Sequence, residues 1–388
     1  MGTAQNRVSL YYFTLFMLPG VLTAYGAIWF SNLGFSEAQI SILNSVPIFI
    51  VLILNLLIGR LADRANDWRT TIIIGSLFAA ISLTGILYSQ DYWVILVCLT
   101  ISNVAMGTTV PVVDAAAVRL ADRMNYGFGV QRAWGTIGYL ILLMVTGEIV
   151  ARYGDASYIW LLLLAAFLRM QAAFFLPKFR APKLEVAPIQ GLVALASVMR
   201  PWFILPLLGY GIINGSHMIL NAFHSLILAR QGYEPLTISL IISLGAVAET
   251  IMFVLFSKIS SRMSSRGFLA IAGVATVVRW VAFGFEPTLF WLIPLQLMHA
   301  ITFALGFVAI VRFISRHVIE ENAAEAQGLM AMIQQIMTIV AMLGFGFFVA
   351  QMGIQAFWVA AGYAALGTVF VFVSLILRGS STDGPIKR

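Results

Sequence analysis

The stretch KFRAPKLEVAPIQGLVALASVMR, residues 178–200, is the longest connection in the chain, and it separates two sets of apolar segments. A helix that crosses a bilayer needs about 20 mostly apolar residues, and each of these segments is long enough. Six precede the connection, at about 8–30, 38–59, 70–89, 92–118, 130–152 and 157–177, and six follow it, at about 201–229, 235–257, 267–285, 288–313, 325–351 and 354–377. We therefore predict an all-α integral membrane protein with twelve transmembrane helices in two six-helix halves.

The composition of the whole chain agrees with a membrane protein. Hydrophobic residues make up 61% of its 388 residues and charged residues 10%, whereas a soluble domain would have roughly a quarter of its residues charged. The net charge of +7 therefore indicates cytoplasmic loops and not a nucleic-acid partner. The N-terminal stretch has no small-residue cleavage pattern, so we interpret it as the first transmembrane helix.

The loops between the apolar segments alternate in charge. Lys and Arg cluster in every second loop, and the opposite loops are short and mainly acidic. Because basic loops stay in the cytoplasm, we predict a multi-pass protein of the cell inner membrane with both termini cytoplasmic. The expected domains are an N-terminal six-helix bundle (1–177), a cytoplasmic basic linker (178–200), and a C-terminal six-helix bundle with a short cytoplasmic tail (201–388). Two such halves are typical of large transporter folds.

The loop GRLADRANDWR, residues 59–69, resembles the loop motif of the major facilitator superfamily. Gly59 would let neighbouring helices approach closely, and Asp63 can cap a helix or pair with a basic group. Arg64 and Arg69 would stay in the headgroup region. In the superfamily this loop is associated with gating between inward and outward states. A charge cluster that only sets the topology is the alternative interpretation.

Three ionisable residues lie near the middle of predicted C-terminal helices: Glu249 in GAVAETIMF, Arg279 in TVVRWVAF and His299 in LQLMHAITFAL. A charge at this depth costs roughly 2.5–3.5 kcal/mol on insertion scales, so each residue needs a reason. Desolvation favours the neutral acid of Glu249, whereas a nearby guanidinium favours the carboxylate. These opposed influences suit a proton carrier, so we assign the three residues to proton coupling. The alternative is a permanent ion pair between two helices.

A different set of residues lies toward the cytoplasmic ends of three N-terminal helices: Asp114, Arg132 and Arg169. Their depths allow them to approach one another. Two guanidinium groups against one carboxylate would leave about one positive charge, which suits an anionic substrate group. Trp134 is among several aromatic residues that could stack on a substrate ring. The alternative for both arginines is snorkelling to the interface.

A polar stripe runs through GIINGSHMILNAFHSL, residues 211–226. Its Asn and His residues recur at spacings of three and four, which places them on one face of a helix. The two that lie nearest the middle, His217 and Asn221, can hydrogen-bond a substrate without a fixed charge. Hydrogen bonding between helices of the bundle is the alternative.

Several blocks together resemble the phenylpropionate permease-like group of the superfamily, which is related to lactose permease. The blocks are FGVQRAWGTIGY (128–139), GAVAETIMF (245–253), VVRW (277–280) and LQLMHAITFAL (295–305). The resemblance implies that three residues occupy charged positions of the group's eighth, ninth and tenth spans: Glu249, Arg279 and His299. It also implies that Asp114 pairs with Arg132. Lactose permease has a second acid one turn after the histidine, where this chain has Thr302, so more of the proton handling would fall on Glu249.

The resemblance implies a proton-coupled importer, a symporter, of a small organic molecule that carries an aromatic ring or an anionic group. It would work by alternating access around a midplane cavity. The alternatives are an importer of siderophores, sugars or nucleosides, a proton-coupled exporter of drugs or metabolites and, more remotely, a membrane sensor on a transporter scaffold. The expected partners are the substrate, protons and the lipid bilayer, with the chain as a monomer. No nucleotide loop or hydrolase motif occurs, so we expect no enzyme activity, cofactor or metal.

Overall fold

The computed structural model describes residues 3–64, 67–124, 128–179, 200–259, 262–318 and 323–377, with the side chains of 55–64, 122, 257 and 323–325 left undescribed. Every regular element in these ranges is a helix. The chain forms two compact units: unit 1 comprises residues 1–185 and 225–243, and unit 2 comprises residues 186–224 and 244–388. The division passes through two long helices, α10 (Pro201–Arg230) and α11 (Pro235–Ile259).

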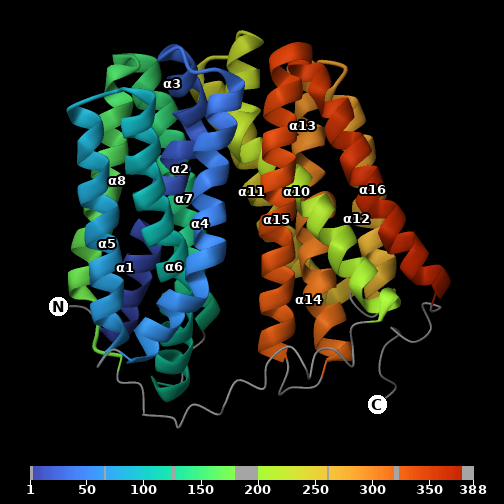
Figure 1. Cartoon of the computed structure of the whole chain (residues 1–388), viewed down its shortest axis with the longest axis horizontal. Coiled ribbons are helices and arrows are strands. Elements are labelled where there is room, and N and C mark those ends of the chain that lie inside the picture. Colours follow the sequence, from blue (N-terminus) through green and yellow to red (C-terminus); the bar gives the residue numbers. More distant parts are fainter. Residues whose placement is uncertain are drawn as a thin grey trace. The chain divides into compact units, whose positions relative to one another are not determined.

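Unit 1 consists of helices, the longer of which lie side by side (Figure 1). In chain order these are α1 (Ala4–Leu15), α2 (Met17–Val21), η1 (Leu22–Gly26), α3 (Ala27–Asn32), α4 (Glu37–Arg64), α5 (Trp68–Thr84), η2 (Gly85–Leu87), α6 (Tyr92–Met124), α7 (Phe128–Tyr153) and α8 (Ala156–Phe175). Helix α1 packs along α7, and α5 packs along α6 and α8. Gly138 allows the close approach of α7 to α1, because a Cβ atom there would collide with the backbone oxygen of Phe13.

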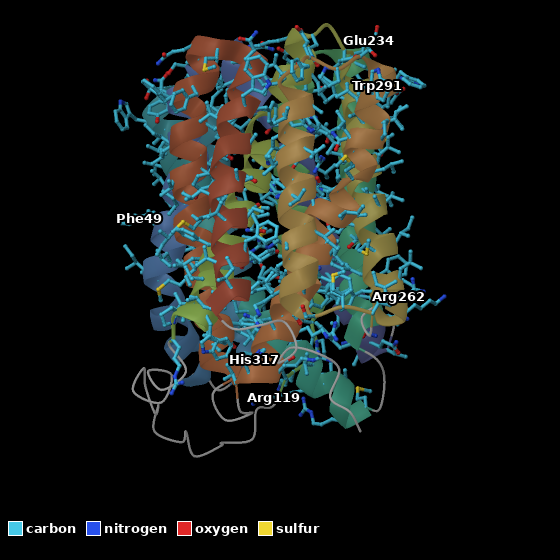
Figure 2. The ribbon with its side chains drawn as sticks, turned by 90° about the vertical axis from the view of Figure 1, so that its right-hand side faces the viewer. Phe49, Arg119, Glu234, Arg262, Trp291 and His317 are labelled. Carbon is cyan, nitrogen blue, oxygen red and sulfur yellow. The ribbon has the colours of Figure 1, made fainter. Side chains whose placement is uncertain are left out.

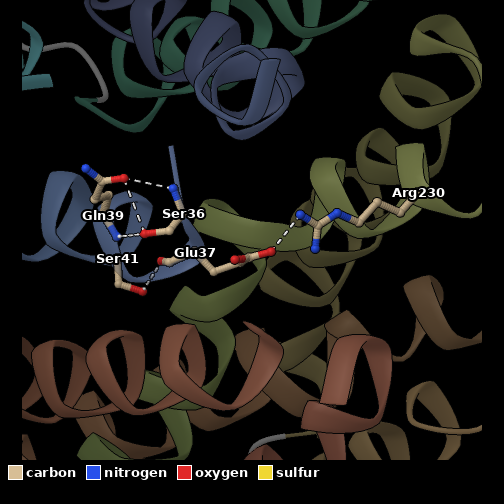
Figure 3. Close-up of polar contacts among 5 residues, drawn as sticks. All are labelled: Ser36, Glu37, Gln39, Ser41 and Arg230. Atoms are coloured by element: carbon tan, nitrogen blue, oxygen red, sulfur yellow. Dashed lines mark hydrogen bonds and ion pairs between the residues drawn. The ribbon is translucent and has the colours of Figure 1, made fainter. Parts of the chain in front are cut away.

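The start of α4 is fixed by a capping box (Figure 3). The backbone N–H of Ser36 donates to Gln39 Oε1 at 2.9 Å, and the backbone N–H of Gln39 donates to Ser36 Oγ at 3.3 Å. This reciprocal pair satisfies two N–H groups that a helix start leaves without partners. Glu37 lies between Ser36 and Gln39 in the sequence. Its Oε1 is 2.6 Å from Nη2 of Arg230, the last residue of α10. The ion pair therefore fastens the 225–243 segment to α4 within unit 1.

Unit 2 contains the first part of α10, the second part of α11 and the remaining helices of the chain. These are α12 (Ser265–Phe283), α13 (Leu289–Leu297), η3 (Ala300–Leu305), α14 (Gly306–His317), α15 (Ala323–Met352), η5 (Gly353–Gln355) and α16 (Ala356–Leu377). Helix α12 packs along α16 and against η3 and α14. Ser264 begins α12, because its Oγ accepts a hydrogen bond from the backbone N–H of Gly267 at 3.1 Å.

Eleven helical stretches in the described part of the chain are long and apolar enough to cross a membrane. One of them, Ala326–Leu377, covers 52 residues and contains both α15 and α16. Large apolar side chains are exposed along the helices, and Phe49 and Trp291 point away from the ribbon (Figure 2). So much exposed apolar surface marks contact with lipid. The structure is therefore that of an all-helical, multi-pass membrane protein.

Two predicted segments lie largely outside this description. The predicted linker covers residues 178–200, of which 180–199 are not described, and the predicted cytoplasmic tail falls in 378–388, which are not described either.

Candidate functional site

A buried guanidinium group lies at the centre of a polar cluster in unit 2. Arg279, on α12, is 0% exposed. Its Nη1 is 3.1 Å from His299 Nδ1 and donates to Thr302 Oγ1 at 3.2 Å, and its Nη2 donates to Gln296 Oε1 at 3.1 Å. These three partners are neutral groups. The cluster therefore bonds both terminal nitrogens of the guanidinium, whereas its Nε has no hydrogen-bond partner among the described residues.

The three partners come from one irregular helical segment. Gln296, His299 and Thr302 follow one another at intervals of three residues, which brings their side chains to the same side. Helix α13 ends at Leu297, and η3 is a π-helical turn that begins just after His299. Such wide turns occur frequently at functional sites. The segment therefore presents three acceptors to one guanidinium on α12.

Glu249, on α11, joins the cluster through His299. Its Oε2 lies 3.4 Å from His299 Nε2, and the two side chains are 27% and 16% exposed. Gly245, one turn earlier on α11, faces the same segment, where an added Cβ would lie 3.4 Å from Gln296 Oε1 and 3.7 Å from His299. The structure thus brings together the three residues that the sequence assigned to proton coupling, with His299 between the acid and the guanidinium.

Aromatic rings surround the cluster. The His299 ring stacks on Phe303 with centroids 4.8 Å apart, and the Arg279 guanidinium lies 4.9 Å from the Trp280 ring. A cation over an aromatic face is stabilised by the ring quadrupole. Trp280 is held in turn, because its Nε1–H donates to Ser216 Oγ at 2.9 Å. The rings leave the polar groups little freedom to move.

The polar stripe of α10 reaches this cluster in part. His224 Nε2 is 3.0 Å from Gln296 Nε2, and the His217 ring lies 5.7 Å from the His299 ring. Asn221 is exposed, and its Nδ2 contacts Met218 Sδ at 3.6 Å. Of the two stripe residues assigned to substrate, the structure places His217 beside the cluster and Asn221 on an accessible face one turn away.

A second polar cluster lies in unit 1 and is more open. The Tyr12 hydroxyl donates to Asp114 Oδ1 at 2.5 Å, and Arg132 Nε is 3.9 Å from the same oxygen. The side chains of Asp114 and Arg132 are both 38% exposed. The guanidinium also lies 4.3 Å from the Phe16 ring. Tyr12 thus holds the carboxylate closely, while the guanidinium is farther away than a hydrogen bond allows.

The structure does not bring Arg169 into this second cluster. Arg169, on α8, is buried, and none of its three guanidinium nitrogens has a hydrogen-bond partner among the described residues. Trp134 is exposed and packs edge-on against Phe13, with centroids 6.3 Å apart. The predicted N-terminal site therefore reduces to Asp114 and Arg132, with Tyr12 added to them.

The loop assigned to gating is described only in part. Three of its residues have side chains outside the described part of the chain: Gly59, Asp63 and Arg64. Arg69 Nη2 donates to the backbone oxygen of Phe174 at 2.6 Å. Asp67 Oδ1 accepts from the backbone N–H of Arg69 at 2.9 Å and from that of Phe179 at 3.0 Å. These bonds tie the start of α5 to the end of α8.

Some polar partners were not foreseen from the sequence. Gln296 and Thr302 were not assigned to Arg279, and Tyr12 was not assigned to Asp114. The three-residue spacing of Gln296, His299 and Thr302 was a signal for the first two. No comparable signal pointed to Tyr12, which is 102 residues from its partner. Among the described residues there is no group of His, Cys, Asp and Glu that could hold a metal ion.

Two proteins with sequences similar to this chain are named as a transporter and a permease. It is 28% identical to the probable 3-phenylpropionic acid transporter of Escherichia coli (strain K12) over 377 residues, which cover 94% of this chain and 96% of that protein. It is 23% identical to the maltose permease of Geobacillus stearothermophilus over 301 residues, which cover 75% of this chain and 74% of the permease.

Solved structures agree on the fold. The nucleoside transporter NupG matches with a TM-score of 0.82 at 18% identity, over 97% of this chain and 100% of NupG. A bacterial homologue of the human lysosomal transporter Spinster, in an inward-facing and unoccupied conformation, matches with a TM-score of 0.77 at 14% identity, over 98% and 97% of the two chains. A family model described as MFS_1 like family matches residues 6–358. The predicted resemblance is therefore confirmed: the chain belongs to the MFS_1-like family and is a secondary transporter of the major facilitator superfamily, not an enzyme.

Proposed function

We propose that the protein is a proton-coupled importer of a small organic molecule that carries an aromatic ring or an anionic group, and that it works by alternating access. The observation that carries the proposal is the contact of Glu249 with His299, whose other ring nitrogen bonds the buried Arg279. An ionised Glu249 compensates the charge of Arg279. When Glu249 is protonated, it no longer compensates the positive charge of Arg279, which favours an anionic substrate.

Linkage makes this coupling reciprocal. If protonation of Glu249 strengthens the binding of an anion, then the bound anion strengthens proton binding by the same factor. Release of the substrate then favours release of the proton. Glu249, Arg279 and His299 would therefore carry the coupling, with Glu249 as the group that binds the proton.

The cluster in unit 1 supports an anionic substrate group. The guanidinium of Arg132 is accessible and is only loosely paired with Asp114, so it can bind a carboxylate by a two-pronged hydrogen bond. The E. coli relative is named for an acid with both a ring and a carboxylate. We assign four residues to substrate binding: Asp114, Arg132, His217 and Asn221. Trp134 and Arg169, which lie outside the two clusters, remain predictions from the sequence.

A sugar or nucleoside is the second candidate substrate. Neutral hydrogen-bonding groups, represented here by His217 and Asn221, suit hydroxylated molecules. The maltose permease relative and the structural similarity to a nucleoside transporter also favour this candidate.

We further propose twelve transmembrane helices, two six-helix halves joined by residues 178–200, and an inner-membrane location with both termini cytoplasmic. The 52-residue stretch Ala326–Leu377 would be about 78 Å long at 1.5 Å per residue, while a bilayer core is about 30 Å thick. It therefore supplies two crossings. In this arrangement Gly59, Asp63, Arg64 and Arg69 form the gating loop, and the protein acts as a monomer.

Proton uptake into vesicles tests the coupling. Purified protein is reconstituted with an internal pH indicator, and labelled 3-phenylpropionate is added with the outside more acidic. Wild-type protein is expected to accumulate the probe and to acidify the lumen. Glu249→Gln is expected to bind the probe without either response. Glu148→Gln is the matched control, because Glu148 lies on α7 and pairs with Arg152. Undiminished accumulation by Glu249→Gln would refute the assignment, and outward movement of the probe would indicate an exporter.

A further inference from the structure

The protonation of His217 is determined by its backbone contact. His217 is 2% exposed, and its Nδ1 is 2.9 Å from the backbone oxygen of Ile213, four residues earlier on α10. A carbonyl oxygen only accepts hydrogen bonds, so the proton of the neutral imidazole is on Nδ1. Nε2 then carries a lone pair. This nitrogen has no hydrogen-bond partner among the described residues.

His299 has the opposite protonation. Its Nδ1 faces Arg279 at 3.1 Å, and arginine has donors but no acceptor. His299 Nδ1 therefore accepts, and the imidazole proton is on Nε2, where it faces Glu249 Oε2 at 3.4 Å. The His217 and His299 rings lie 5.7 Å apart with their planes at 63°. The His299 ring, whose Nε2–H faces the Glu249 carboxylate, thus lies beside the His217 ring, whose Nε2 has no hydrogen-bond partner among the described residues.

Two features keep the acceptor of His217 available. A proton added to Nε2 would create a second cation beside a ring that already bonds Arg279, and like charges repel strongly away from water. The ring is also confined, since Trp280 and Phe303 lie 5.1 and 5.8 Å from it. His217 therefore presents one lone pair in one direction.

We propose that His217 Nε2 accepts a hydrogen bond from a hydroxyl or N–H group of the transported molecule, and that this contact selects substrates with such a donor. The inference rests on the proposed function and specifies the chemistry of one group in its site. Asn221, one turn along the same face of α10, is exposed, and Glu249 and His299 are partly exposed, so a ligand can approach from this side. A buried acceptor without a partner is costly, which penalises a substrate that lacks the donor.

Two variants test the role of the Nε2 acceptor of His217 separately from that of the rest of its ring. The amide of His217→Asn reaches only the Nδ1 position, so it can keep the bond to Ile213 and leaves the Nε2 position vacant. The amide of the longer His217→Gln reaches the Nε2 position and offers an oxygen there. The probes are 3-phenylpropionate and its three ring-hydroxylated analogues, which share the ring and the carboxylate.

The measurement is the Kd of each probe for purified full-length protein. In the wild type the best hydroxylated analogue is expected to bind about tenfold more tightly than the parent acid, a difference of 1.4 kcal/mol. His217→Gln should keep most of this preference, and His217→Asn should lose it. Equal affinities in the wild type, as expected if His217 only holds a water molecule, would overturn the inference. A preference that persists in His217→Asn would do the same.

Nitrogen NMR of histidine-labelled protein gives a second test that needs no ligand. The expected signature is a protonated Nδ1 and an unprotonated Nε2 for His217, with the reverse for His299. A proton on Nε2 of His217 overturns the inference whatever the transport result. If no probe binds to the wild type, the proposed substrate class fails, and the NMR assignment alone then decides whether His217 is an acceptor.

Discussion

The two polar clusters of this transporter stabilise a buried or partly buried arginine in different ways. In unit 2, Arg279 is fully buried and hydrogen-bonded to three neutral groups, and the acid Glu249 contacts one of these groups, His299. In unit 1, Arg132 is partly exposed and faces its acid, Asp114, at 3.9 Å. One cation is fixed by geometry, and the other is balanced by an opposite charge that is not closely bound.

This difference suggests that one cluster binds the substrate and the other couples its transport to protons. A loosely paired arginine can exchange its carboxylate for that of a ligand at little cost, because both states are ion pairs. A buried arginine with three directed hydrogen bonds cannot move without leaving acceptors unpaired. We therefore expect substitutions of Asp114, Arg132 and Tyr12 in unit 1 to change substrate affinity, and substitutions of Arg279 and its hydrogen-bond partners in unit 2 to change the coupling itself.

The largest effect is expected for Arg279→Lys. Lysine keeps the charge but offers a single ammonium, which cannot reproduce the planar fork that reaches Gln296, His299 and Thr302. We expect coupled uptake in vesicles to fall at least about a hundredfold, as for loss of a buried charged network worth roughly 3 kcal/mol or more.

Arg266→Lys is the matched control for this substitution. Arg266 lies on the same helix, is also 0% exposed, and its Nη1 donates to the backbone oxygen of Ser374 at 2.7 Å. A lysine keeps the charge and can donate to the same backbone oxygen, so uptake should stay within about threefold of the wild type. Equal losses in both variants would show that any buried arginine of α12 matters only for folding.

The next largest effect is expected for Arg132→Gln. Loss of a charge-assisted contact to a carboxylate is worth roughly 1.5–3 kcal/mol, so the KM for 3-phenylpropionate should rise about tenfold to a hundredfold with a much smaller change in kcat. Asp114→Asn should lower KM, since the guanidinium remains and no longer has a competing carboxylate. Transport assays over a range of substrate concentrations separate the two parameters. A fall in kcat at constant KM would contradict the assignment of Arg132 to substrate affinity.

The fold was largely predictable from the sequence, because a bilayer imposes length and polarity on every crossing. The apolar segments predicted from 8–30 to 354–377 correspond to helices of the structure, and the eleven stretches found include one that contains α15 and α16. The irregular turns were not predicted. The sequence of Ala300–Leu305 is mainly apolar, and apolarity alone does not distinguish an α-helix from a π-helical turn.

The candidate site was predictable where a charge had to be explained. Glu249, Arg279 and His299 were selected because ionisable groups are costly at membrane depth, and the structure brings them together. Tyr12 and Gln296 carry no such signal, because neutral polar residues are common in helices and their partners depend on packing. Arg169 shows the reverse case: its depth was compatible with Asp114, yet compatible depth does not determine which way a side chain points.

A smaller effect is expected for Tyr12→Phe, and the neighbouring Tyr11 supplies the control. Tyr12 donates to the carboxylate of Asp114 at 2.5 Å, whereas Tyr11 shares a neutral hydrogen bond of 3.0 Å with Ser76. Tyr12→Phe releases the carboxylate to pair more closely with Arg132, so the KM for 3-phenylpropionate should rise about threefold to tenfold. Tyr11→Phe should lower the Tm and leave KM unchanged. The reverse pattern would contradict the assignment of Tyr12 to the site.

The smallest effect is expected for Thr302→Val, which removes one of the three acceptors around Arg279 and preserves the side-chain shape. The guanidinium keeps its bonds to Gln296 and His299, so the loss should be about 1 kcal/mol of stability, seen as a lower Tm, with uptake within about threefold of the wild type. Thr368→Val is the control, since the Thr368 hydroxyl donates to the backbone oxygen of Ala364 within its own helix, α16, at 2.8 Å. A complete loss of coupling in Thr302→Val would mean that the position of Arg279 depends on this one contact. In that case the network in unit 2 would be as easily rearranged as the pair in unit 1, and the distinction between a fixed and an exchangeable cation would fail.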